Sequence, residues 1–464
     1  MTLGEPKGGR SAAWEYTSAF PEIVWPALPA GDGAATLGLL FQLESTQWLS
    51  ADRLLDLQMS QLKVVLRNAH ATVPHYREAW RERYDPEAPL TPERFSSLPL
   101  LTRRELQASF EALKSGSVPV THGSVNEARS SGSTGTPVRI LKTQLSQLLW
   151  NAFTLRDHLW HRRDLRGRLA AIRHGVPAGE FPGWGLATHG LVATGPSAVL
   201  GIKEDIDAQL QWLEGQQPSY LVTYPSNLAE LVKRSRARGI RFPGLREART
   251  LGELLTPEVR ELCRRAWGIP VIDMYSAEEV GYIALQCPLH EHYHVQSEGV
   301  LVEILDERGG ACAPGEVGRV VVTTLHNFAM PLVRYELGDY AEAGEACPCG
   351  RGLPVIRRIV GRVRNVLIGA TGSRYWPGFG SHGFPEIAPI LQHQFVQKSF
   401  ELIEARLVTQ VPLTIEQEEN LKRHILSALP SGFRVNFVYC DRIPRSAGGK
   451  YEDFVSEVAL PQPP

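Results

Sequence analysis

The segment Ser130-Ser131-Gly132-Ser133-Thr134-Gly135-Thr136-Pro137 combines small hydroxyl residues with glycines and offers no side chain that fills a hydrophobic core. Glycine lets the backbone approach a ligand closely, and hydroxyl and backbone N–H groups donate hydrogen bonds to phosphate oxygens. The following Val138-Arg139-Ile140-Leu141 predicts a β-strand, whereas a Walker A loop ends in Gly-Lys-Ser/Thr and opens a helix. The segment therefore predicts a polyphosphate-binding loop of another kind; the alternative is a flexible Ser/Gly linker.

Composition indicates an ordinary globular protein that acts on a small molecule. The chain has 464 residues, 43% of them hydrophobic, which is enough for one large and one smaller domain or for two to three domains. Its 49 basic and 50 acidic residues give a net charge of -1, so no charge excess favours nucleic acid or an anionic membrane as partner. No apolar run approaches the roughly 18 residues of a membrane span. The N-terminus lacks a signal pattern, and six cysteines are too few for a disulfide scaffold, so we expect a cytoplasmic protein.

The pattern along the chain predicts an α/β protein. Residues 145–345 alternate helical patterns with short apolar strands, such as 220–223 and 271–275. Before them, residues 54–80 favour an amphipathic helix that Pro74 ends or kinks. Residues 1–45 are rich in Gly, Pro and Ala and predict a weakly ordered N-terminal extension.

The last hundred residues have a different character. They predict a strand at 400–408, a helix opened by a capping box of Thr414 and Gln417, and a second strand at 434–439. Strand, helix and strand in so short a stretch indicate a small α+β domain. We therefore place a large domain at 46–360 and a small one at 361–464.

Four further polar segments follow the Ser130–Pro137 loop. Tyr275-Ser276-Ala277-Glu278-Glu279 ends a predicted buried strand, where α/β proteins place ligand contacts. The others are Arg334-Tyr335-Glu336-Leu337-Gly338-Asp339, Gly361-Arg362-Val363-Arg364-Asn365 and Pro444-Arg445-Ser446-Ala447-Gly448-Gly449-Lys450. In this order the five segments resemble the motifs of the adenylate-forming superfamily of acyl-CoA synthetases and related ligases. That resemblance implies a large multi-sheet adenylation domain with a small mobile C-terminal domain.

Other stretches narrow the resemblance to the phenylacetate-CoA ligase branch. They lie at 73–78, 224–228 and 251–253, and the stretch at 392–397 resembles the capsule-biosynthesis relatives of that branch. The resemblance implies a small carboxylic acid, aryl or other, as the substrate. It also places the acyl pocket around Tyr224, Pro225 and Ser226.

The resemblance implies a role for each matching residue. Tyr275 lies against adenine, Glu279 binds the Mg²⁺ that bridges the phosphates of ATP, and Asp339 accepts hydrogen bonds from both ribose hydroxyls. Arg362 pairs with phosphate or ribose, and Lys450 brings positive charge to the reacting groups. Lys450, Glu279 and Arg362 are the expected catalytic residues. The expected nucleotide-binding residues are Ser130, Ser131, Gly132, Ser133, Thr134, Gly135, Thr136, Tyr275, Ser276, Asp339 and Arg362.

Two of these motifs depart from the family pattern. Ser276 stands where the family has Gly, and Glu278 replaces the Thr that usually faces the α-phosphate. In the hinge on which the C-terminal domain swings, Arg364 and Asn365 replace an acidic pair.

A cysteine and histidine cluster predicts a structural zinc ion. Cys347 and Cys349 flank Pro348, and Cys287 lies sixty residues before Cys347 and close to several histidines. Thiolates and imidazoles at such spacing can build a closed tetrahedral site, which would join the segments that follow Glu279 and Asp339. The resemblance implies Cys287, His294, Cys347 and Cys349 as ligands, with His290 as the alternative fourth ligand. The other possibility is a set of unconnected thiols and exposed histidines.

The expected reaction begins with attack of a substrate carboxylate on the α-phosphate of ATP, which forms an acyl-adenylate and releases pyrophosphate. This step needs no side-chain nucleophile, because positioning, Mg²⁺ and positive charge supply the catalysis. A thiol such as that of CoA then gives a thioester, whereas an amine gives an amide. A nucleotide-binding relative without turnover is the third possibility, although Glu279 and Lys450 favour an active enzyme. Monomer and homodimer are both compatible with the sequence.

Overall fold

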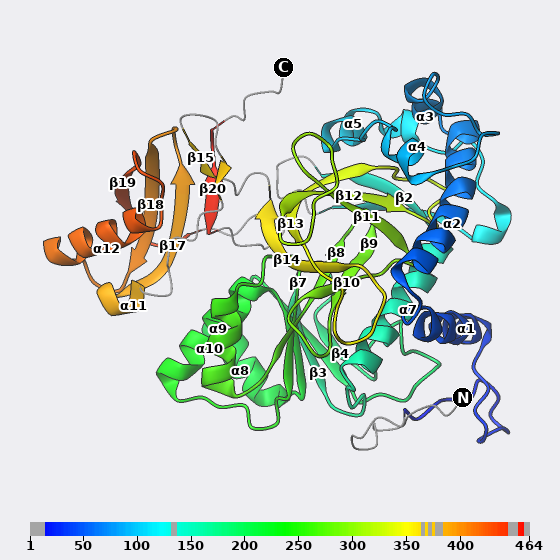
Figure 1. Cartoon of the computed structure of the whole chain (residues 1–464). Coiled ribbons are helices and arrows are strands. Elements are labelled where there is room, and N and C mark those ends of the chain that lie inside the picture. Colours follow the sequence, from blue (N-terminus) through cyan, green and yellow to red (C-terminus); the bar gives the residue numbers. More distant parts are fainter. Residues whose placement is uncertain are drawn as a thin grey trace.

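The computed structural model describes residues 14–130, 137–362, 367–369, 374–375, 384–443 and 453–458. Most of these residues form a large body around a long mixed sheet, and a smaller C-terminal body holds a sheet of its own (Figure 1). The predicted α/β class, with a large multi-strand part and a small α+β part, is confirmed. Within the described residues, no helix is both long and apolar enough to cross a membrane.

The large sheet has twelve described strands in the order β11-β12-β13-β14-β10-β9-β8-β7-β6-β3-β5-β4. The strands β5, β3, β6, β7 and β8 are parallel neighbours, and the strands from β9 to β14 pair antiparallel. The carboxyl ends of the parallel strands therefore meet at one edge. The bounds are β3 (Leu169–Arg173), β4 (Gly179–Phe181), β5 (Ser197–Gly201), β6 (Tyr220–Thr223), β7 (Glu247–Leu251), β8 (Val271–Ala277), β9 (Gly281–Gln286), β10 (Tyr293–Val295), β11 (Val300–Leu305), β12 (Val317–Thr324), β13 (Tyr335–Ala343) and β14 (Val355–Arg362).

Helices cover both faces of the parallel half. On one face lie α8 (Ile206–Gln216), α9 (Pro225–Arg238) and α10 (Pro257–Trp267), and on the other lies α7 (Gln144–Trp160) (Figure 1). Both α9 and α10 begin with proline and end at a left-handed glycine, Gly239 and Gly268. Proline suits the first helical turn and glycine the left-handed cap, so local sequence fixes both helix ends beside the sheet.

The N-terminal region packs a row of helices against the antiparallel half. Its elements are α1 (Gly31–Thr46), α2 (Ala51–Thr72), α3 (Pro74–Ala79), α4 (Pro92–Ser96), α5 (Arg103–Ala108), α6 (Phe110–Leu113), a 3₁₀ turn (Val120–His122) and the hairpin β1 (Val125–Arg129) with β2 (Arg139–Thr143). The predicted helix broken at Pro74 is confirmed, because α2 ends at Thr72 and α3 begins at Pro74.

The prediction of weak order for residues 1–45 is wrong from Gly31 onward, where α1 forms. Leu40 and Leu43 of this helix are buried in clusters that they share with α7. The Gly-rich start of the segment conceals these contacts, which depend on residues more than a hundred positions away.

The C-terminal body is a four-stranded sheet in the order β19-β18-β17-β20, packed against α12 (Ile415–Ser427). The predicted capping box of Thr414 and Gln417 is present at the start of α12, where Leu421 and Ile425 are fully buried. The predicted boundary at Gly361 falls within β14, one residue before that strand ends. The remaining bounds are β15 (Leu367–Ile368), β16 (Arg374–Tyr375), α11 (Phe384–Ile387), β17 (Ile390–Gln397), β18 (Leu402–Thr409), β19 (Arg434–Tyr439) and β20 (Phe454–Ser456).

Candidate functional site

The structure brings Tyr275, Asp339 and Arg362 together from three strands. The Tyr275 hydroxyl donates a hydrogen bond to Oδ2 of Asp339 at 2.8 Å, and Nε of Arg362 lies 3.3 Å from Oδ1. Asp339 on β13 and Arg362 on β14 are register partners, so strand pairing sets their ion pair. A register shift between Tyr275 and Ser276 at the end of β8 changes the direction of the next side chains, as β-bulges near binding sites do.

The Asp339 carboxylate keeps acceptor capacity for a ligand. An ionised carboxylate offers about four acceptor positions, and Tyr275 and Arg362 each occupy one on a different oxygen. Counting the contacts of the described residues, one position on each oxygen therefore remains for a pair of hydroxyl groups. Burial, together with the Asp339 charge, raises the pKa of Tyr275 well above its ordinary value, so its hydroxyl stays a neutral donor.

A second cluster surrounds Glu279. Its Oε1 accepts hydrogen bonds from Arg103 and from the Tyr335 hydroxyl, each at 3.2 Å, and its side chain is buried. Arg103 also reaches Oγ of Ser130 at 3.5 Å. This Ser130 oxygen accepts the backbone N–H of Val138 at 2.8 Å, which closes the base of the Ser130–Pro137 loop. The guanidinium thus connects the predicted Mg²⁺ ligand to the start of the predicted phosphate loop.

Arg103 and the role of Tyr335 were missed by the sequence reasoning. Arg103 is the first residue of α5, whose capping box of Thr102 and Glu105 fixes the helix start. That box was readable as a helix start, but nothing in the local sequence indicates that the helix begins beside Glu279. Tyr335 belongs to a recognised motif, yet only its place on β13 shows that its hydroxyl faces Glu279.

Arg334, the first residue of the Arg334–Asp339 motif, contacts other parts of the protein and not the Glu279 cluster. It adopts a left-handed backbone with φ of 49° and forms an ion pair with Glu303 at 3.0 Å. Its guanidinium also donates to the carbonyl oxygens of Ser96 and Leu98. These contacts attach the N-terminal helices to β13 and keep Arg334 away from the Glu279 cluster.

Glu278, which departs from the family pattern, has a lysine partner. Its Oε1 lies 3.3 Å from Nζ of Lys142 on β2. Ser276 is half-buried at the end of β8. Several predicted residues lie outside the described part of the chain, namely Ser131, Gly132, Ser133, Thr134, Gly135, Thr136, Arg364, Asn365 and Lys450.

The predicted acyl-pocket residues lie at the carboxyl end of β6. The ring of Tyr224 packs in the core beneath α8–α10, and its hydroxyl accepts the backbone N–H of His174 at 3.3 Å. Pro225 begins α9, and the backbone N–H of Ser226 donates to Glu253 at 3.0 Å. These residues therefore sit at the same sheet edge as Tyr275, beside the ends of β3 and β7.

Cys287, His294, Cys347 and Cys349 converge as the zinc prediction requires. Their ligand atoms all lie within 4.8 Å of one another. The Cys287 and Cys347 sulfurs are 3.8 Å apart, and Cys349 Sγ lies 3.4 Å from Nε2 of His294. Ligands at about 2.3 Å for sulfur and 2.0–2.1 Å for nitrogen stand roughly 3.5–3.8 Å apart in a tetrahedron, so the residues fit a zinc ion.

The alternative ligand His290 is not a member of this four-residue group. Its ring stacks on that of His292, with centroids 5.1 Å apart. His292, which the sequence places among the histidines near Cys287, has its Nε2 at 3.0 Å from Cys347 Sγ. Burial lowers the pKa of His294 to about 4, which keeps its imidazole in the neutral form that binds metals.

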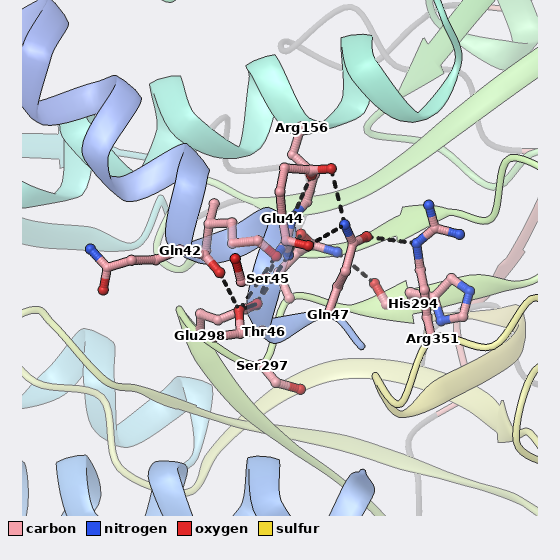
Figure 2. Close-up of polar contacts among 12 residues, drawn as sticks. Gln42, Glu44, Ser45, Thr46, Gln47, Arg156, His294, Ser297, Glu298 and Arg351 are labelled. Atoms are coloured by element: carbon pink, nitrogen blue, oxygen red, sulfur yellow. Dashed lines mark hydrogen bonds and ion pairs between the residues drawn. The ribbon is translucent and has the colours of Figure 1, made fainter. Parts of the chain in front are cut away.

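Hydrogen bonds connect the cysteine and histidine cluster to the body of the protein, and Figure 2 shows one of them, between Arg351 and Gln47. Nδ1 of His294 lies 3.4 Å from the Leu353 carbonyl oxygen, the kind of outer contact that orients a ligating histidine. Arg351 donates to Cys349 Sγ at 3.6 Å and to Oε1 of Gln47 at 2.7 Å. Gln47 directly follows α1, so the cluster is coupled to the N-terminal helix.

Comparison with known proteins adds four findings. The sequence profile described as AMP-binding enzyme matches residues 129–330. The phenylacetate-coenzyme A ligase of Thermus thermophilus is 26% identical over 456 residues, covering 89% of this chain and 98% of that protein. A structure of 2-hydroxyisobutyryl-CoA ligase with 2-HIB-AMP in the postadenylation state aligns with a TM-score of 0.69 at 18% identity, covering 86% of this chain and 89% of that one. A structure of the same ligase with 2-HIB-AMP and CoA in the thioesterification state aligns with a TM-score of 0.58 at 19% identity. That alignment covers 89% of this chain and 91% of the other.

The sequence profile, the curated relatives and the fold thus make the chain similar to the adenylate-forming, AMP-binding enzymes. Within that class the chain is phenylacetate-CoA ligase-like, as its motifs predict.

Proposed function

We propose that the protein activates a small carboxylic acid with ATP to an acyl-adenylate and then transfers the acyl group to the thiol of CoA. The observation that carries this proposal is the convergence of Asp339, Tyr275 and Arg362 at the sheet edge that also holds Glu279. Four motif residues from distant segments meet where parallel strands end, the usual location of ligands in α/β sheets.

In the first half-reaction the substrate carboxylate attacks the α-phosphate of ATP and pyrophosphate leaves. Asp339 accepts the two ribose hydroxyls at its remaining acceptor positions, and Tyr275 holds that carboxylate in place. Glu279 would hold Mg²⁺, whose chemistry is to neutralise charge on the phosphates. The buried Glu279 carboxylate suits a hard cation that prefers oxygen ligands.

Arg103 contributes positive charge beside the phosphates. It pairs with Glu279, and its buried Nε has no hydrogen-bond partner among the residues that the structure describes. A cation that already lies between Glu279 and Ser130 can turn toward phosphate oxygens by a change of side-chain rotamer. Preorganised charge of this kind is the main source of catalysis in phosphoryl chemistry.

In the second half-reaction a thiol attacks the activated carbonyl and AMP leaves. We propose that the C-terminal body takes a second orientation for this step. Support comes from 2-hydroxyisobutyryl-CoA ligase, a structural relative of which the postadenylation and the thioesterification states are both known. The choice of CoA over an amine rests on the phenylacetate-CoA ligase relatives. An aryl acid is the substrate class that these relatives favour.

We further propose a structural zinc ion held by Cys287, His294, Cys347 and Cys349. The ligand spacing supports it, and four protein ligands leave no open position for catalysis. The ion would join the loop between β9 and β10 to the loop between β13 and β14.

Pyrophosphate release over a panel of aryl and aliphatic acids tests the proposed function, with CoA or simple amines added in turn. We expect release to depend on one acid class and a CoA thioester to appear by mass spectrometry. An amide product would replace the CoA assignment, and release that no acid stimulates would overturn the adenylation itself.

A further inference from the structure

Each of three acidic residues at the candidate nucleotide site is paired with a cation from another segment. Glu279 pairs with Arg103, Asp339 with Arg362, and Glu278 with Lys142. The first two acids match motif positions with an expected role toward a ligand. Glu278 occupies a position where the family motif has a neutral threonine, so its charge and that of Lys142 need their own explanation.

The strand β2 delivers Lys142 to this position. Side chains alternate along a strand, so Lys142 shares a face with Ile140. Ile140 is fully buried in the same core as Tyr275, which directs that face of β2 toward the end of β8. The Lys142 side chain is 23% exposed and that of Glu278 is 53% exposed. Lys142 is therefore held against the body, and Glu278 extends toward the solvent side of the site.

A carboxylate at position 278 is unfavourable beside a triphosphate. Like charges a few ångströms apart repel by several times the thermal energy where water is partly excluded. An ammonium group at 3.3 Å offsets part of the carboxylate field at such distances and brings the net charge of the pair to zero. The pair then presents little net charge to the nucleotide, as the family threonine does.

We propose that Lys142 is a positioning residue that neutralises Glu278 and so allows a nucleoside triphosphate to bind beside it. This inference rests on the proposed function. Lys142 acts through Glu278 rather than by direct contact with phosphate. The two residues form a charge-compensated unit that replaces the hydroxyl of the family motif.

A double-mutant cycle on Lys142 and Glu278 tests this proposal. ATP binding is measured by calorimetry with Mg²⁺ present and without any acid substrate. Lys142→Met leaves the Glu278 carboxylate uncompensated and should raise the Kd for ATP by about tenfold. Glu278→Thr removes the carboxylate and leaves the Lys142 cation, so it should not raise Kd. The double variant should return to within about twofold of wild type, because the repulsive charge is gone.

A matched control is Lys233→Met, which removes a lysine from an ion pair with Glu230 on the outer helix α9 and should leave Kd unchanged. An unchanged Kd in Lys142→Met would overturn the inference while the proposed function stands. Failure of Glu278→Thr to rescue Lys142→Met would assign Lys142 a direct phosphate contact and overturn the compensation. A wild-type protein that binds no ATP would overturn the proposed function and this inference together.

Discussion

Two regions of the molecule are built on opposite principles. One is the candidate nucleotide site around Glu278, Glu279 and Asp339, called here the nucleotide edge, and the other is the cysteine and histidine cluster. At the nucleotide edge, three acids pair with three cations, and the six residues come from three strands, the turn after β8 and the helix α5. At the cluster, three thiols from two loops and the imidazole of His294 from β10 converge within 4.8 Å of one another. Paired charges can exchange partners when a charged substrate arrives, whereas a closed ligand set only holds its loops together. The comparison separates residues whose loss affects chemistry from residues whose loss affects stability.

The largest effect is expected for Lys450→Ala. Its charge is needed as negative charge moves on the reacting phosphate, so adenylation should fall by about 10³-fold while the fold remains intact. Acid-dependent pyrophosphate exchange measures the loss, and circular dichroism checks the fold. Wild-type exchange in this variant would remove Lys450 from the mechanism.

Asp339→Ala should weaken ATP binding by roughly 1.5–3 kcal/mol, the scale of charged hydrogen bonds to the ribose. Glu342→Ala is the matched control, because Glu342 lies on the same strand and pairs with Arg357 and Arg358 of β14. Calorimetry should separate the two variants. Equal ATP affinity in both would make Asp339 a strand-pairing residue only.

Arg103→Met should lower adenylation about tenfold, mainly through kcat, because the guanidinium supplies charge beside the phosphates. Arg103→Lys should recover part of the rate, since it keeps the charge without the fork geometry. Steady-state kinetics give both values. A loss of thermal stability with kcat unchanged would mean that Arg103 serves only to anchor α5.

Cys347→Ser should lower Tm by about 5 °C or more and leave the chemical step nearly unchanged at low temperature. Metal analysis should find about one zinc per wild-type chain and none in the variant. Cys440→Ser is the control, because Cys440 lies outside the cluster. Protein purified without chelator that contains no metal would contradict the zinc proposal.

Much of the fold and of the two candidate sites could be predicted from the sequence, because the motif residues lie near strand ends and helix caps, which have local sequence signatures. The strands β6 and β8, the break at Pro74 and the capping box at Thr414 agree with their predictions. The positions of Cys287, His294, Cys347 and Cys349 also agree, although the pattern alone left His290 open.

The contacts that depend on tertiary packing could not be predicted. Arg103 reaches Glu279 across 176 positions, and Lys142 reaches Glu278 across 136. Neither arginine nor lysine carries a local signature, since both types are common on exposed helix and strand faces. The helix α1 was missed for the same reason, because α7 supplies the surface that buries it.

Acyl-adenylate formation at this site is tested most directly by acid-dependent exchange of labelled pyrophosphate into ATP. The exchange is measured with the wild-type protein in the absence of CoA. We expect exchange that requires both the acid and Mg²⁺ and that is lost in Lys450→Ala. The same exchange should persist in Cys347→Ser at low temperature. Absence of exchange over the whole acid panel, in protein that is folded and binds ATP, would contradict the assignment of this site to acyl-adenylate formation.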